Sequence, residues 1–143
     1  MSSPQSRRIA AALVRRAGPS ADANQLADSA VALWRDIDTS LSPIIGTRGL
    51  AALQGRSLYL ASYGFGWLKD LQDHRVRSEI DYDLPRRIFM TQPMPESQAA
   101  ATATFLCFHD LLASMVGPSL TARLLDAIWD NPIGGQAAQD VSA

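Results

Sequence analysis

The sequence has few of the residues on which covalent and metal chemistry depend. Cys107 is its single cysteine, which excludes an internal disulfide framework and any multi-cysteine zinc site. Two histidines, His74 and His109, cannot form a three-histidine cluster within one chain. Lys69 is the single lysine, and no glycine-rich phosphate loop leads into it. We therefore expect a chain that is not an enzyme and that holds no metal and no cofactor.

Long apolar runs and a strong net charge are missing as well. The longest charge-free stretch in the apolar part of the chain is residues 97–108, whereas a membrane-spanning helix needs about 20 apolar residues. The apolar run at residues 9–14 is too short for a signal-peptide core and is followed by Arg15. A net charge of −1 and a pI of about 6.0 leave no nucleic-acid footprint. We expect a cytoplasmic protein with no transmembrane segment and no specific nucleic-acid partner.

Apolar residues are plentiful and recur at the spacing of helices. They make up 47% of the chain, which is enough to bury a core. Apolar residues three and four positions apart predict one face of each helix. The expected fold class is all-α, a compact bundle of about five helices, at residues 6–17, 22–41, 48–63, 96–116 and 120–130, with a short helix near 67–73. We find no internal repeat.

Candidate core positions follow from the same stripes. The residues expected to be most buried are Leu53, Leu60, Phe105, Phe108, Leu112 and Leu124. Ser42-Pro43 is expected to interrupt the second helix, because the residue before a proline is pushed out of the helical region. Ile44 and Ile45 are then expected to fill the core at this corner. The domain organisation expected is a basic helix or arm at 1–18, one bundle at 19–131 and a flexible tail at 132–143.

The segment at about 74–95 changes character and predicts one long irregular connection. Polar and apolar residues alternate from Ser78 to Leu84, and we expect an extended piece there with a turn of helix at 84–90. Loops of this length are functional or flexible. The connection is a candidate docking strip for a protein partner because it carries mixed charges, namely Arg75, Arg77, Glu79, Asp81, Asp83, Arg86 and Arg87. Its three alternating carboxylates lack the glycine and the distal glutamate of a calcium loop, so no metal is predicted.

The first helix is basic along one side. Four arginines, Arg7, Arg8, Arg15 and Arg16, fall on one half of its wheel, and no acidic residue precedes Asp22. A basic amphipathic helix can contact an anionic membrane surface. The few apolar residues between the arginines predict only weak contact. The alternative interpretation is a helix that docks on the bundle through Ile9, Leu13 and Val14.

His109 is a candidate phosphoacceptor. It lies in the middle of the 96–116 helix, in a setting similar to that of histidine phosphotransfer domains, which are helical bundles of comparable size. Those domains place lysine and glycine three and four residues after the histidine, whereas this chain has Leu112 and Ala113. The stretch 112–123 resembles a helix-turn-helix, but a buried position of its second helix would fall on Arg123.

Aromatic residues suggest a further kind of site. Trp34, Tyr63, Trp67 and Trp129 are candidates for lining an apolar ligand pocket, although core packing explains aromatic residues on helix stripes equally well.

These observations predict a non-enzymatic regulatory or protein-interaction domain, for which bacterial signalling is one setting. The alternatives are a small-molecule sensor with an apolar pocket and a histidine phosphotransfer-like protein that uses His109. Helix 48–63 has little polar side to show water, so it is expected to be covered on most of its circumference. Broad apolar faces favour association, and the partner is expected to be a protein, with a second copy of the chain in a homodimer as one option.

Overall fold

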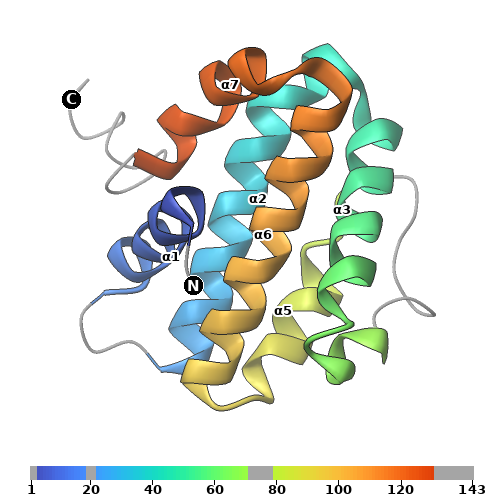
Figure 1. Ribbon diagram of the computed structural model, residues 1–143. Helices are drawn as coiled ribbons and strands as arrows, with labels where there is room; N and C mark the ends of the chain where they lie inside the picture. Colours follow the sequence, from blue (N-terminus) through green and yellow to red (C-terminus); the bar gives the residue numbers. More distant parts are fainter. Residues whose placement is uncertain (1–2, 19–21, 71–78, 131–143) are drawn as a thin grey trace, which may run out of the picture.

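The protein is an assembly of helices. The computed structural model describes residues 3–18, 22–70 and 79–130, and within these ranges it contains no strand. The elements are α1 (Pro4–Ala17), α2 (Ala23–Ile45), α3 (Thr47–Ala61), the short 3-10 helix η1 (Gly66–Lys69), α5 (Asp83–Met90), α6 (Met94–Val116) and α7 (Pro118–Asp130) (Figure 1). The predicted all-α helical bundle is confirmed. The predicted tail at 132–143 lies outside the described residues.

Two long helices of 23 residues each, α2 and α6, run side by side in the same direction through the middle of the bundle (Figure 1). Their facing stripes meet at aromatic side chains. The ring centroid of Trp34 lies 4.6 Å from that of Phe105 and 5.4 Å from that of Phe108. All three side chains are buried, and aromatic pairs at such separations add to the free energy gained by burial. This contact forms the centre of the core.

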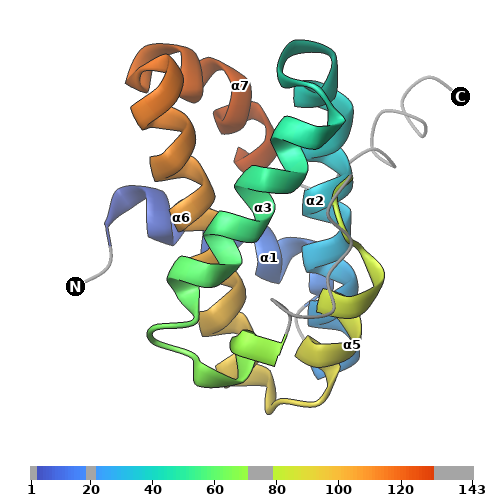
Figure 2. The same ribbon diagram turned by 90° about the vertical axis from the view of Figure 1, so that its right-hand side faces the viewer.

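Each long helix ends at a corner made of one glycine. Gly46 joins α2 to α3 with a φ of +92°, and Gly117 joins α6 to α7 with a φ of +91°. A side chain at either position would be strained, because positive φ is a region that residues with a Cβ rarely adopt. Both corners lie at the same end of the bundle (Figure 2). The chain therefore reverses direction there twice, with one residue between the helices each time.

The chain consists of two halves with the same arrangement of helices. A shift of 71 residues places Gly46 on Gly117, α2 on α6 and α3 on α7. Every buried residue of α6 and α7 then falls on a buried residue of α2 or α3, as Trp34 on Phe105 and Leu41 on Leu112 illustrate. The preceding helices correspond in part, because α1 packs on α6 and α5 packs on α2, whereas α1 also packs on α2 and α7. A repeat of the burial pattern is thus present, which the residue sequence did not reveal.

The predicted end of α2 at Pro43 is wrong. The helix continues through this proline to Ile45. A proline removes the hydrogen bond to the carbonyl four residues earlier, here that of Thr39. Thr39 and Pro43 are both exposed in the last two turns, where water can take the place of the lost donor. Ile44 consequently points outward with 61% of its surface exposed, whereas Ile45 packs against the core as expected.

The segment 74–95 is not shown as one long irregular connection. Residues 71–78, on which part of the prediction falls, lie outside the described residues, and α5 and the first turn of α6 occupy much of the remainder. Asp81 initiates α5, since its carboxylate accepts hydrogen bonds of 3.2 Å from the backbone N–H groups of Asp83 and Leu84. Phe89 then buries its ring in the core. The expected turn of helix is therefore a full helix with a buried face.

Four of the six expected core residues, Leu53, Phe105, Phe108 and Leu112, are buried. Leu60 and Leu124 are only partly buried, and Leu124 packs against the core from the edge.

The core assignment predicts a large loss of stability in Phe108→Ala. Phe108 has no exposed surface, and truncating a buried phenylalanine removes its burial and leaves a cavity. We expect the free energy of unfolding to fall by about 3–5 kcal/mol, measured by chemical denaturation. Met115→Ala on the same helix is the control, because Met115 is 62% exposed and its truncation should change stability little. Equal losses in the two variants would contradict the assignment.

Candidate functional site

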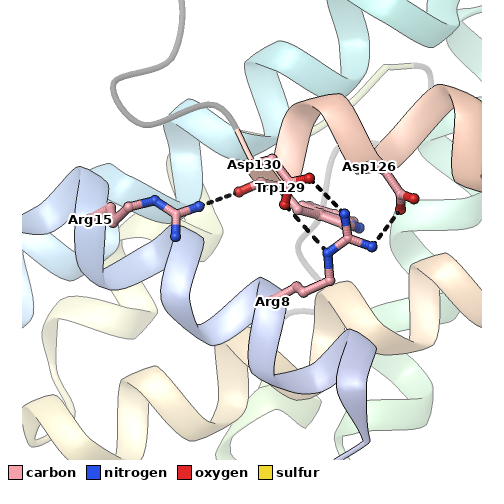
Figure 3. A network of polar contacts seen from close by, with 5 residues as sticks. All are labelled: Arg8, Arg15, Asp126, Trp129 and Asp130. Atoms are coloured by element: carbon pink, nitrogen blue, oxygen red, sulfur yellow. Dashed lines mark hydrogen bonds and ion pairs between the residues drawn. The ribbon is translucent and has the colours of Figure 1, made fainter.

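The arginines of α1 bind the end of α7. Arg8 forms ion pairs with Asp126 at 3.2 Å and with Asp130 at 2.6 Å, and hydrogen bonding to Asp130 raises the pKa of Arg8 (Figure 3). Arg15 donates a hydrogen bond of 2.6 Å to the backbone carbonyl of Trp129. A cation at a helix C-terminus compensates the negative end of the helix dipole. We call these contacts the α1–α7 clamp.

Arg16 makes similar contacts to a carboxylate and a backbone carbonyl deeper in the bundle. Its side chain is only 5% exposed, and its Nη2 atom lies 2.7 Å from a carboxylate oxygen of Asp36 and 3.4 Å from the carbonyl of Ile128. Ile9 and Leu13 of α1 are fully buried, as the docking interpretation of this helix required, whereas Val14 is 38% exposed. Arg8, Arg15 and Arg16, which were considered for membrane contact, are therefore engaged within the bundle.

The aromatic pocket candidates are spread over different parts of the bundle. Trp34 and Trp129 are buried in the core, and both rings pack against Phe105. Trp67 packs edge-on against Phe89 at a centroid separation of 5.4 Å. Tyr63 is 73% exposed on the surface. These four side chains thus occupy three different environments.

The mixed-charge strip is also divided. Arg75 and Arg77 lie outside the described residues. Glu79 is exposed, whereas Asp81 is buried and its backbone is held by the side-chain amide of Gln54 through two hydrogen bonds of 2.8 Å. The remaining strip residues form ion pairs at the surface, Arg86 with Asp28 at 2.6 Å and Arg87 with Asp83 at 3.3 Å.

His109 is a largely buried residue of α6, with 14% of its side chain exposed. Its Nδ1 atom is 3.2 Å from a carboxylate oxygen of Asp110. Leu112, the residue at the position where phosphotransfer domains carry lysine, is buried. Cys107 is half-buried, and burial, followed by the charge of Asp110, raises the pKa of its thiol.

The outer face of α3 was not anticipated. Five exposed residues follow one another at helical spacing along it, namely Arg48, Ala52, Arg56, Tyr59 and Tyr63, the last just beyond the helix end. We call this set the α3 face; α3 crosses the front of the bundle in Figure 2. The hydroxyl groups of Tyr59 and Tyr63 lie 2.8 Å apart, and the guanidinium of Arg56 lies 5.4 Å from the ring centroid of Tyr59.

A signal for the α3 face is present in the sequence. No acidic residue occurs between Asp38 and Asp70, although Arg48, Arg56 and Lys69 fall in that interval. Because α3 was expected to be covered on most of its circumference, no exposed basic face was predicted for it. Small residues in α3, such as Gly55, are buried and allow close approach on the inner side, so the opposite side remains open.

A groove runs between α2 and α7. It has a volume of about 440 Å³ and is lined by Asp36, Thr39, Ser40, Arg123, Leu124, Ala127 and Ile128. We call it the α2–α7 groove. Its volume lies within the range of ligand pockets, and its position on the surface was not predicted from the sequence.

Two further properties bear on function. Among the described residues, no group of three or more histidine, cysteine, aspartate or glutamate side chains is placed to hold a metal ion. Helix α6 is long and apolar enough to cross a membrane by length and composition, which the sequence analysis did not expect. The same criteria are met by core helices of water-soluble proteins, and α6 contacts α1, α2, α3 and α7.

The raised pKa of Cys107 predicts slow alkylation. Because the thiolate is the reactive form, a thiol whose pKa is raised has less of it at neutral pH. Reaction of the native protein with iodoacetamide should be slower than that of a free thiol, and its rate should reach half-maximum at a higher pH. Unfolding in guanidinium should restore the ordinary rate. A native half-maximum at or below the pH of a free thiol would contradict this prediction.

The buried amide of Gln54 predicts a local effect at the start of α5. Gln54→Leu replaces the amide by an apolar side chain of similar size and removes both hydrogen bonds to the backbone of Asp81. The loss should lower the free energy of unfolding by about 1–3 kcal/mol. Hydrogen exchange at the Asp81 amide should accelerate more than exchange at the core amides of α2. Unchanged exchange at Asp81 would show that Gln54 does not hold this segment.

Comparisons with known proteins find no relative. No protein-family model matches the chain, and neither a curated protein nor a solved structure matches it. The α3 face and the α2–α7 groove are surfaces that core packing does not explain, and their chemistry is the basis of the proposals below.

Proposed function

We propose that the chain is a non-enzymatic protein-interaction domain that binds an acidic segment of a partner protein on the α3 face. The observation that carries the proposal is the exposed series of arginine and tyrosine side chains along one helix. Tyrosine and arginine are enriched among the residues that dominate binding energy at protein interfaces. Core packing gives no reason for large side chains on this outer side.

Charge favours an acidic partner. Among the described residues, Arg48 and Arg56 form no ion pair, whereas Arg8, Arg16, Arg86 and Arg87 each have a carboxylate partner within the bundle. Complementary charge steers encounter and suppresses wrong partners. Self-association through this face would bring arginines of two copies together without a carboxylate on α3 to oppose them. The predicted homodimer, if it forms, would therefore use another surface.

The side chains of the α3 face are held in position before binding. Tyr59 and Tyr63 pack edge to face with centroids 5.4 Å apart, and hydrogen bonding to Tyr59 raises the pKa of Tyr63. The cation of Arg56 lies over the ring of Tyr59. A side chain that is already ordered loses less conformational entropy when a partner binds. The pair of tyrosines therefore supports binding more than two mobile rings would.

Site-specific photocrosslinking in cells of the protein's source tests the proposal. A photoreactive phenylalanine analogue at Ala52 lies within the α3 face, and the same analogue at Ala99, an exposed alanine of α6, is the matched control. We expect adducts at Ala52 that are absent at Ala99, and mass spectrometry should place the cross-link in an acidic segment of one protein. Arg56→Glu should weaken binding of that segment about tenfold or more, and added salt should weaken it further.

Several outcomes would overturn the proposal. Equal adducts at Ala52 and Ala99 would show non-selective contact. A cross-linked segment without acidic residues, or an affinity unchanged by Arg56→Glu, would exclude charge recognition by α3. Adducts to nucleic acid would replace the protein partner by a different class of ligand. A lack of any adduct at Ala52 would mean that the α3 face stays in solvent.

A further inference from the structure

The α2–α7 groove has two unlike walls. Helix α2 supplies polar groups, the carboxylate of Asp36 and the hydroxyl groups of Thr39 and Ser40. Helix α7 supplies the apolar side chains of Leu124 and Ile128 and the guanidinium of Arg123. A ligand that satisfies both walls needs an apolar part and a polar end.

The charges in the α2–α7 groove indicate whether the polar end of the ligand is negative or positive. The negative charge of Asp36 is neutralised by Arg16, whose side chain is 5% exposed. Arg16 also lies 3.4 Å from the carbonyl of Ile128. Arg123 is exposed and, within the described part of the chain, has no ion-pair partner. The uncompensated charge of the groove is therefore positive. An anionic group is the complement of Arg123, because guanidinium binds carboxylate and phosphate oxygens through paired hydrogen bonds.

The two halves of the bundle differ at this point. When the second half of the chain is aligned with the first by the shift of 71 residues, Asp36, Ser40 and Arg123 correspond to Cys107, Leu111 and Ala52. These three residues lie on α6 and α3. There the helices close on each other, and Leu53 and Ser57 of α3 are buried. Their counterparts on α7 are Leu124, which is only partly buried, and Ile128. Asp36, Ser40 and Arg123 of the open half thus stand where the closed half has Cys107, Leu111 and Ala52, whereas Ile128 stands where it has Ser57.

We propose that the α2–α7 groove binds a small amphipathic organic anion, a carboxylate or a phosphate monoester joined to a short apolar group. Arg123 binds the anionic group, the side chains of Leu124 and Ile128 contact the apolar part, and the hydroxyl groups of α2 accept or donate hydrogen bonds. The volume of about 440 Å³ suits a ligand of this size. The proposal is independent of the α3 face, since no residue is shared between the two surfaces.

Titration followed by two-dimensional ¹H–¹⁵N NMR tests the proposal on the full chain. Octanoate probes the carboxylate class, phenyl phosphate probes the phosphate class, and octanol, which lacks the charge, is the matched neutral ligand. We expect saturable shifts at Thr39, Ser40, Leu124 and Ala127 with at least one of the two anions. Whichever anion binds more tightly identifies the class of headgroup.

Three variants separate recognition from non-specific binding. Arg123→Gln should weaken binding of the anion about tenfold, the loss expected for one charge-assisted contact. Arg48→Gln removes another exposed, unpaired arginine and should leave the affinity unchanged. Ala127→Phe fills the groove from an exposed position and should abolish the shifts without lowering the melting temperature.

The outcomes that overturn the proposal are distinct. If octanol bound as tightly as octanoate, Arg123 would not recognise an anionic group. Equal losses in Arg48→Gln and Arg123→Gln would indicate general attraction to positive charge. Shifts that do not saturate with either anion, or that persist in Ala127→Phe, would show that the groove is not the site. Each result is obtained from the isolated chain and leaves the test of the α3 face unaffected.

Discussion

The packing of Trp34 against Phe105 and Phe108 is the contact on which the other parts of the bundle depend. It joins the two long helices α2 and α6, and α1, α3, α5 and α7 each contact one or both of them. The buried stripes that surround it are continuous from α1 to α7. The surroundings of these rings are apolar, and buried polar side chains elsewhere in the bundle, such as Gln54 and Ser97, are held by hydrogen bonds to the backbone. The two surfaces proposed for binding lie on the outer side of α3 and between α2 and α7.

Local sequence signals predicted the helices well and the surfaces poorly. The 3.6-residue period placed α6 within two residues of its observed start, because a strong stripe depends only on neighbours along the chain. The signal at Pro43 was overruled, because its exposed position tolerates the proline. The turn of helix expected at 84–90 is present, and the buried ring of Phe89 stabilises it as part of α5. Propensity is a weak prior wherever packing decides the outcome.

The polar contacts could not be predicted for a different reason. Arg8 and Asp130 are 122 residues apart, and nothing local distinguishes Asp130 from the other eleven aspartates as its partner. The amide of Gln54 similarly holds a backbone segment 27 residues away. The α2–α7 groove depends on how far two helices separate, which is a property of packing and not of either helix. Of these features, only the α3 face has a signal in the sequence, namely the long interval without acidic residues.

The α1–α7 clamp couples the first helix of the described chain to the last. Synthesis proceeds from the N-terminus, at about 5–20 residues per second. During the interval before α7 emerges, on the order of ten seconds, the buried arginine on α1 has no carbonyl from α7 to bind, and the apolar side of α1 lacks part of its cover. The early chain therefore exposes a surface that is both apolar and basic. The clamp therefore forms only after α7 has been synthesised, and until then this side of α1 stays without its α7 cover.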